Sequence, residues 1–490
     1  MANGTYDIVI RGGTVATASD SFQADVAIAG ETIAAIGRDL GTGRREIDAS
    51  GKLVLPGGVD SHCHIEQLSA AGIMNADTWE TATASAAYGG TTTVISFAAQ
   101  HVGMNLADVV TDYAALARKG AIVDYCFHMI VADPTEATLK EHLPALIREG
   151  HASIKVFMTY DRLRVDDEQL LDVLLTAREN RALVCVHAEN HGMIAWMGKR
   201  LVERGYTAPK FHAMSHPRVS EAEAFNRLIA MAALVDQPIM IFHVSTSEGA
   251  AVIRRARGEG LKVFAETCPQ YLFMTAQDLD RPGLEGAKWM CSPPARTEGD
   301  QEALWRALAL GDLQTVSSDH APYAYDETGK LRAGPNANFK QVANGMPGLE
   351  TRLPVLFDAM VSKGGMGVEK FVELTATAPA KIYNLHPKKG SIAVGADADV
   401  AIWDPDKAVT LSDEGVHDLT RYTPYAGRTV QGWPITVLRR GEVIVDAARL
   451  TASAGSGRFL PRTGGAATEP LGRLEAEMDP ARNFGATLID

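Results

Sequence analysis

Two histidines stand one residue apart in the stretch LPGGVDSHCHIEQ, residues 55–67. His62 and His64 follow a short apolar run, and because side chains alternate along a strand, both imidazoles are expected on one face. A single histidine at such a place is usually a packed or surface residue. A pair of neutral imidazoles can bind zinc and similar divalent ions, so the pair predicts a metal site if further ligands lie nearby.

Further candidate ligands follow later apolar runs of the chain. His187, His243 and Asp319 each stand at the end of such a run. Taken singly, each histidine is more often a satisfied core residue, and Asp319 could cap the turn that follows it. His128 has no partner by spacing and is interpreted as packing. Taken together, the imidazoles and the carboxylate form a donor set suited to zinc, which favours a metal site.

Lys155 lies inside the apolar run SIKVFMTY. A charged lysine is costly to bury, and burial lowers its pKa. A neutral amine can add carbon dioxide to form a carbamate, which would act as a carboxylate-like ligand able to bridge two metals. A lysine paired with a carboxylate of the same core explains the position equally well, so the spacing leaves both interpretations open.

Continuous apolar runs alternate with helical stretches between residues 56 and 385. Eight runs can be counted, at 57–64, 91–100, 124–131, 153–160, 182–189, 238–245, 262–269 and 313–320. Apolar strands separated by helices are typical of parallel strands buried on both faces, and eight of them predict a (β/α)8 barrel. Catalytic groups of such barrels lie at the carboxyl ends of the strands, so the candidate ligands should converge on one rim.

Both ends of the chain show a different pattern. Residues 1–55 and 386–450 alternate with period two between glycine turns, which predicts one discontinuous β-sandwich domain. The fold class is therefore α/β, with a TIM-like barrel over 56–385 and a smaller β-sandwich domain built from both chain ends. Residues 451–490 are rich in glycine and alanine, and we expect a C-terminal tail that is disordered or contacts a neighbouring subunit.

The composition excludes several classes of partner. A net charge of −13 argues against nucleic acid or an anionic membrane as the main partner. No apolar run approaches the ~20 residues that a membrane helix needs. The five cysteines are scattered without a CxxC pair, which is typical of reduced core thiols, so we expect a cytoplasmic protein.

Eight segments resemble those of a known family: GGVDSHCH, SIKVFMTY, VCVHAEN, FHVST, AETCPQYL, CSPPAR, SSDHAP and NGMPGLETRLP. In this order and spacing they are similar to the dihydropyrimidinase and D-hydantoinase family of cyclic amidohydrolases, within the amidohydrolase superfamily. The resemblance implies a hydrolase that opens dihydropyrimidines or 5-substituted hydantoins to N-carbamoyl amino acids. Family members are often homotetramers, so we expect a tetramer or dimer.

The same resemblance implies a binuclear metal centre, usually of Zn²⁺. The implied ligands are His62, His64 and Asp319 for one ion, His187 and His243 for the other, and carboxylated Lys155 as a bridge. A metal-bridging hydroxide would attack the ring carbonyl, with Asp319 as general acid and base. Tyr160 would donate its hydroxyl to the developing oxyanion. The main chain at Ser292 and Asn344 would contact the –CO–NH–CO– edge of the ring.

The loop after the histidine pair departs from the family pattern. It reads IEQLSAAGIMNADTW, where hydantoinases commonly have an apolar loop that contains proline. Glu66 stands where dihydroorotases carry an arginine, so it is expected to repel a substrate carboxylate. Gln67 and Ser69 predict a more polar or roomier pocket than one built for a phenyl ring.

Two other functions are compatible with these motifs. The first is an allantoinase or another cyclic-imide hydrolase of the superfamily, because SSDHAP also resembles the allantoinase branch. The second is a non-catalytic oligomeric scaffold of the same fold. Such scaffolds have lost the metal ligands, whereas every ligand position is filled in this sequence, which argues against this function.

Overall fold

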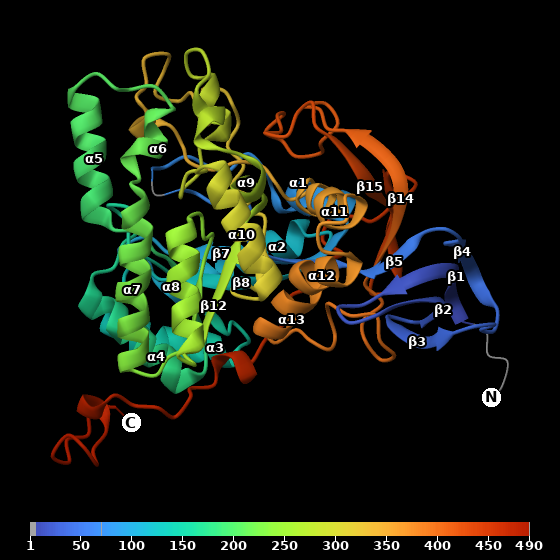
Figure 1. Cartoon of the computed structure of the whole chain (residues 1–490). Helices are drawn as coiled ribbons and strands as arrows, with labels where there is room; N and C mark the ends of the chain where they lie inside the picture. The colour runs from blue at the N-terminus through green and yellow to red at the C-terminus, as the bar shows by residue number, and fades with distance from the viewer. Residues whose placement is uncertain (1–5, 70, 490) are drawn as a thin grey trace.

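Eight parallel strands form the barrel in the computed structural model, which describes residues 6–69 and 71–489 (Figure 1). They are β6 (Gly58–Cys63), β7 (Thr91–Ala99), β8 (Asp124–Ile130), β9 (Ser153–Phe157), β10 (Leu183–His187), β11 (Ile239–Ile241), β12 (Val263–Thr267) and β13 (Thr315–Val316). Each strand pairs with the next one along the chain. Almost every residue in them is buried, which explains the continuous apolar runs and confirms the predicted barrel.

Helices connect and surround these strands (Figure 1). They are α1 (Trp79–Tyr88), α2 (Leu106–Gly120), α3 (Leu143–Arg148), α4 (Asp167–Asn180), α5 (His191–Glu203), α6 (Phe211–Ser215), α7 (Arg218–Leu234), α8 (Ser247–Gly258), α9 (Pro269–Phe273), α10 (Glu298–Leu310), α11 (Arg352–Phe357), α12 (Val368–Val372) and α13 (Ala378–Ile382). Local sequence fixes several starts. Asp166, for example, accepts the backbone N–H of Gln169, whose side chain bonds back to Asp166 in a capping box. None of the described helices is long and apolar enough to cross a membrane.

The first and last strands of the barrel meet through a buried arginine and the backbone beyond β13. Arg352 donates to the carbonyl oxygens of Val59 in β6 and Val316 in β13, each at 3.1 Å. Beyond the end of β13, the backbone N–H of Asp319 donates to the carbonyl of His62 at 2.9 Å. These bonds close the barrel and place two of the predicted metal ligands side by side.

Nine strands from both ends of the chain form the second sheet (Figure 1). They are β1 (Tyr6–Ala16), β2 (Ser21–Ala29), β3 (Thr32–Gly37), β4 (Gly43–Asp48), β5 (Leu53–Pro56), β14 (Val400–Thr410), β15 (Thr429–Arg439), β16 (Glu442–Asp446) and β17 (Arg449–Leu450). The antiparallel pair β5 and β14 joins the two halves. The expectation that both chain ends build one β unit is confirmed, and we retain 1–55 with 386–450, 56–385 and 451–490 as proposed domain limits.

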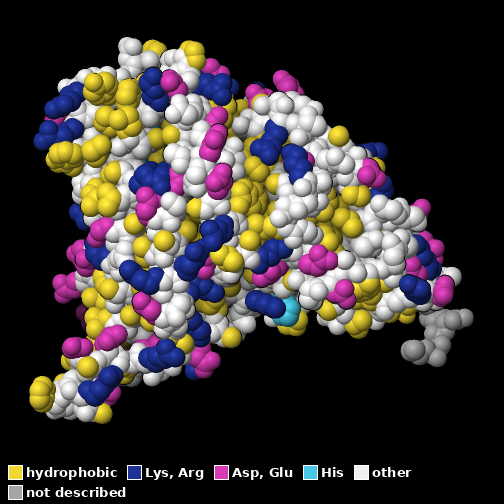
Figure 2. Space-filling view, in the orientation of Figure 1, with side chains coloured by type: hydrophobic (Ala, Val, Ile, Leu, Met, Phe, Trp, Pro, Cys, Tyr) yellow, Lys and Arg dark blue, Asp and Glu magenta, His cyan; other side chains and the backbone are white. Residues whose placement is uncertain are grey.

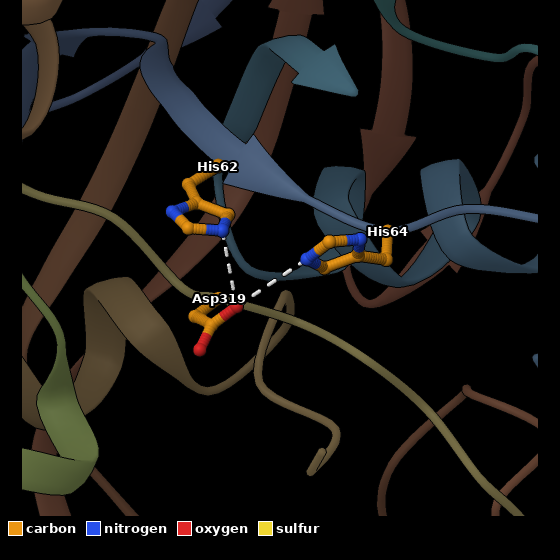
Figure 3. Close-up of side chains that lie close together, drawn as sticks. All are labelled: His62, His64 and Asp319. Carbon is orange, nitrogen blue, oxygen red and sulfur yellow. Dashed lines mark ion pairs between the residues drawn. The ribbon is translucent and has the colours of Figure 1, made fainter. Parts of the chain in front are cut away.

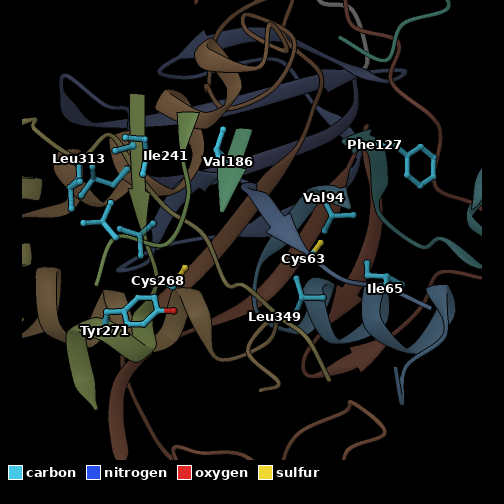
Figure 4. Close-up of a cluster of buried hydrophobic side chains, with 14 of the residues drawn as sticks. Cys63, Ile65, Val94, Phe127, Val186, Ile241, Cys268, Tyr271, Leu313 and Leu349 are labelled. Carbon is cyan, nitrogen blue, oxygen red and sulfur yellow. The ribbon is translucent and has the colours of Figure 1, made fainter. Parts of the chain in front are cut away.

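A continuous apolar core fills the space between strands and helices (Figure 4). It includes Cys63, Val94 and Phe127 from the barrel strands together with Leu349 from the loop that follows β13. His128 in β8 is buried as well, and its ring nitrogens bond to Ser153 Oγ at 2.8 Å and to the carbonyl of Ser61 at 2.9 Å. It is a satisfied core histidine, in line with its interpretation as packing.

The C-terminal segment packs against the barrel of its own chain. The backbone of Leu460 donates to Tyr125 at the start of β8, at 2.8 Å. The buried Arg462 guanidinium donates to the carbonyl of Phe127 at 2.6 Å and to Ser153 Oγ at 2.9 Å. Only the last stretch of the tail leaves the body of the molecule, at the lower left of Figure 1. Most of the segment is therefore ordered by contacts within the chain, where the sequence had left disorder open.

Candidate metal centre

A cavity of about 530 Å³ opens at the carboxyl ends of the barrel strands. All nine site residues that the sequence predicts contribute to its lining: His62, His64, Lys155, Tyr160, His187, His243, Ser292, Asp319 and Asn344. They come from five barrel strands or the loops that follow them and from the loops around 292 and 344. The fold therefore brings the complete predicted set to one place.

His62, His64 and Asp319 form the tightest group of donor atoms (Figure 3). Their ligand atoms lie within 4.8 Å of one another. Asp319 Oδ1 is 3.2 Å from His62 Nε2 and 3.6 Å from His64 Nε2. Burial opposes the charge of Asp319, but the neighbouring His62, His64 and His243 hold the pKa of this carboxyl well below its usual range. Asp319 is therefore a carboxylate at neutral pH.

His187 and His243 lie beside this group. Their ring centroids are 4.4 Å apart, and the centroid of His243 is 5.5 Å from that of His62. His187 Nε2 bonds to Glu189, which leaves Nδ1 as its available ring nitrogen. Burial lowers the pKa of both imidazoles, so both are neutral and able to bind an ion.

Lys155 is buried at the bottom of the cavity among aromatic rings. Its Nζ lies 4.2 Å from the ring centroid of Phe242 and 4.7 Å from that of Phe157. Among the described residues it has no ion pair with a carboxylate, which removes the alternative of a lysine paired within the core. Burial lowers the pKa of Lys155 to about 7, so a large share of the amine is neutral near that pH.

This donor set fits divalent ions. Four imidazoles and one carboxylate line one cavity, and these are ligands that zinc prefers. A cationic lysine without an anionic partner is unfavourable in such a place, whereas its carbamate would satisfy the same position as an anionic ligand. The structure thus offers candidate ligands for divalent ions in one cavity, and their assignment to two ions stays a prediction.

Tyr160 lies in the loop after β9, beside His187. Its ring is 5.0 Å from that of His187, and its hydroxyl shares a hydrogen bond with Ser292. Burial raises the pKa of Tyr160 well above its usual value, so the hydroxyl keeps its proton and remains a donor. The side-chain Oδ1 of Asn344 is buried and has no hydrogen-bond partner among the described residues. Tyr160, Ser292 and Asn344 therefore present polar groups around the same opening.

Three site residues adopt the left-handed backbone conformation that L-residues rarely use. The φ angles are +73° at Tyr160, +42° at His243 and +48° at Asp319. Such angles cost about 1–3 kcal/mol each and persist where the surrounding structure enforces them, most often at functional sites. The backbone is therefore strained at three of the predicted site residues.

Two buried glutamates support the site and were missed by the sequence analysis. Glu189 Oε2 lies 2.8 Å from His187 Nε2, and Glu266 Oε1 lies 2.5 Å from His62 Nδ1. Glu189 follows His187 by two residues, directly after the end of β10, and this spacing is a signal that could have identified it. Glu266 lies on β12, far from His62 in sequence, and only the fold brings them together.

The loop after the histidine pair contributes some of its polar side chains to the cavity and not others. Glu66 is not among the described residues that line the cavity, because its Oε2 accepts the backbone N–H of Trp79 at 3.1 Å, at the start of α1. Its carboxylate is turned toward the start of α1, and the repulsion of a substrate carboxylate stays a prediction. Gln67 and Ser69 do line the cavity, and Gln67 Oε1 lies 2.8 Å from His64 Nδ1. Two polar side chains therefore line this side of the pocket.

Known proteins resemble this chain over nearly its whole length. Residues 53–444 match the Amidohydrolase family. A D-hydantoinase of Ralstonia pickettii is 42% identical over 457 residues, which are 93% of this chain and 99% of that protein. The crystal structure of dihydropyrimidinase from Brevibacillus agri superimposes with a TM-score of 0.91 at 40% identity, covering 94% of this chain and 99% of that one. L-Hydantoinase (dihydropyrimidinase) from Arthrobacter aurescens follows with a TM-score of 0.86 at 28% identity, covering 94% and 100%.

Proposed function

Because the chain belongs to the amidohydrolase family, we propose that it opens the cyclic amide of dihydropyrimidines or 5-substituted hydantoins to N-carbamoyl amino acids. It is an enzyme of the hydrolase class that acts on carbon–nitrogen bonds in cyclic amides. The observation that carries the proposal is the convergence of all nine predicted site residues on one cavity. A scaffold without catalysis would not need to keep this donor set intact.

We assign two divalent ions to the cavity, with zinc as the expected metal. The proposed ligands are His62, His64 and Asp319 for one ion, His187 and His243 for the other, and Lys155 carboxylated by carbon dioxide between them. The unpaired, partly neutral amine of Lys155 supports this modification. When bound, two such ions acidify water near neutral pH and polarise the substrate carbonyl.

The residues of the chain then handle protons and position the ring. Asp319, held as a carboxylate, accepts a proton from the attacking water and returns it to the ring nitrogen as the carbon–nitrogen bond breaks. The Tyr160 hydroxyl donates to the oxygen that becomes negative as the carbonyl carbon turns tetrahedral. The main chain at Ser292 and Asn344 holds the –CO–NH–CO– edge. Gln67 and Ser69 face the ring substituent.

We also propose that the chain works as a homo-oligomer in the cytoplasm. Hydrophobic side chains gather over α5 and α6, at the upper left of Figure 2. Trp196 in α5, Met214 in α6 and Val219 at the start of α7 are each more than half exposed. Apolar surface of this kind marks interaction sites, and a second copy of the chain would cover it. Light scattering should give a dimer or tetramer that Trp196→Glu weakens, and a stable monomer would refute this assignment.

A substrate panel on the zinc-loaded enzyme tests the proposed activity. Dihydrouracil, hydantoin, 5-phenylhydantoin, allantoin, dihydroorotate and succinimide would be followed by the loss of ultraviolet absorbance on ring opening. We expect turnover of the first three. Turnover of allantoin alone would instead identify an allantoinase, and no turnover of any ring by protein that holds two metals would refute the proposed substrates.

A further inference from the structure

Both carboxylate oxygens of Glu189 are occupied by histidines. Oε2 accepts from His187 Nε2 at 2.8 Å, and Oε1 accepts from His216 Nδ1 at 2.9 Å. Glu189 is fully buried and His216 is nearly so. The ring of His187 is therefore fixed in orientation, with Nε2 turned to Glu189 and Nδ1 left for the cavity.

His216 connects Glu189 to the neighbouring strand end. Its carbonyl oxygen accepts from Arg296 Nη1 at 2.5 Å, and Arg296 Nε donates to Ser245 Oγ at 3.1 Å. Ser245 follows His243 by two residues, as Glu189 follows His187. One chain of buried hydrogen bonds thus joins the segments that carry the two histidines of this half of the site. Arg296 belongs to the same loop as Ser292, so the chain also reaches the substrate side.

The proposed histidine ligands of the other ion, His62 and His64, have separate hydrogen-bond partners. Glu266 Oε1 contacts His62 Nδ1 at 2.5 Å, and Gln67 Oε1 contacts His64 Nδ1 at 2.8 Å. No hydrogen bond in the described part of the chain joins Glu266 or Gln67 to Glu189, His216 or Arg296. His243 Nδ1, in contrast, is buried without a partner among the described residues. The orientation of the pair His187 and His243 therefore depends more strongly on Glu189.

We propose that Glu189 is the positioning residue for the ion held by His187 and His243, and that it acts through His187 and through His216. This proposal rests on the two-ion centre of the proposed function. Carboxylates that hold the distal nitrogen of a metal-binding histidine fix its orientation and make it more basic. Glu189 therefore sets the affinity for one ion, and Glu266 separately supports the other.

The test measures zinc bound per chain in the full-length protein. Wild type and Glu189→Gln would be equilibrated against chelator-buffered Zn²⁺ and analysed by plasma mass spectrometry. Glutamine replaces one of the two carboxylate oxygens by an NH2 group, which cannot accept, so one of the bonds to His187 and His216 is lost. We expect Glu189→Gln to retain one ion with wild-type affinity and to bind the other about 10- to 100-fold more weakly.

Two comparisons locate the weakened ion. His187→Asn removes a ligand from the same half, so adding Glu189→Gln to it should release no further zinc. Glu266→Gln should weaken the opposite ion, so its combination with Glu189→Gln should leave neither ion tightly bound. Glu350→Gln is the matched control, because Glu350 is a buried glutamate bonded to His417 at 2.9 Å away from the cavity. That variant should hold both ions as wild type does.

A folded Glu189→Gln that binds both ions with wild-type affinity overturns the proposal, as does extra zinc loss in the double variant with His187→Asn. If Glu189→Gln fails to fold, Glu189→Asp provides the test, since it keeps the charge and withdraws the carboxylate by one methylene. Weakened binding of one ion by Glu189→Asp supports the proposal, and unchanged binding refutes it. Failure of the proposed function would look different: wild type would neither bind two ions nor open any ring of the panel.

Discussion

Replacing Asp418 by asparagine is expected to stabilise the protein at alkaline pH and to do so less in acid. Asp418 is 8% exposed and lies in the loop between β14 and β15. Its Oδ1 accepts from the backbone N–H of Thr420 at 3.0 Å and from the Thr420 hydroxyl. Burial, followed by the nearby charge of Asp77, raises the pKa of Asp418 from 3.8 to about 6.

The raised pKa of Asp418 determines at which pH this carboxyl stabilises the folded chain. The folded chain holds this proton more tightly than the unfolded chain, so the carboxyl favours folding most below pH 4. That contribution is lost as the pH rises through about 6. A rise of roughly two pKa units corresponds to about 3 kcal/mol of destabilisation at pH 8, which falls to about 1 kcal/mol at pH 4.5. Asparagine removes the charge and keeps the oxygen that accepts from Thr420.

Calorimetric melting at both pH values measures the effect. For a chain of this length, about 1 kcal/mol shifts Tm by about 1 °C. Asp418→Asn should therefore raise Tm by about 3 °C at pH 8 and by about 1 °C at pH 4.5. Asp413→Asn is the control, since Asp413 is a half-buried carboxylate of the same loop that accepts from the backbone of Thr423. An equal shift of Asp418→Asn at both pH values, or none at pH 8, would refute the reasoning.

Three further changes test other parts of the structure. Tyr160→Phe removes the proposed oxyanion donor, so kcat should fall about 10²- to 10³-fold. Zinc content and Tm should stay unchanged. An undiminished kcat would show that Tyr160 takes no part in the mechanism. Lys155→Ala removes the amine that would become the bridging carbamate, so bound zinc and ring opening should both be lost, and retention of two ions would contradict the assignment. Arg462→Met breaks the hydrogen bonds to Phe127 and Ser153, which together contribute about 2–3 kcal/mol to the free energy of unfolding. Tm should therefore fall by about 2–3 °C. An unchanged Tm would show that these bonds contribute little to stability.

The barrel was predictable because its strands are buried on both faces. Burial on both sides requires apolar runs, and these runs survive in the sequence as a local pattern. The clustering of the proposed metal ligands was predictable for a related reason, since a barrel places the ends of its strands on one rim. His62, His187 and Asp319 could therefore be grouped without knowledge of any side-chain contact.

Other features depend on contacts that no local pattern records. Glu66 has the residue type of a pocket carboxylate, but its backbone, with φ at +48°, turns the side chain to the start of α1. Glu266 supports a histidine more than 200 positions away. Arg462 stands in a stretch rich in glycine and reads as part of a tail, although it is buried under the barrel. In each case the partner is brought near by the fold as a whole.

The pairing of β5 with β14 has a consequence for folding of the chain during its synthesis on the ribosome. Strand β5 ends at Pro56, and its neighbour β14 begins at Val400. At about 5–20 residues per second, the nascent chain waits roughly 17 to 70 s between the synthesis of the two strands. During that interval β5 presents an unpaired edge, and unpaired strand edges are prone to aggregation. A shortage of chaperones during synthesis should therefore lower the yield of folded protein.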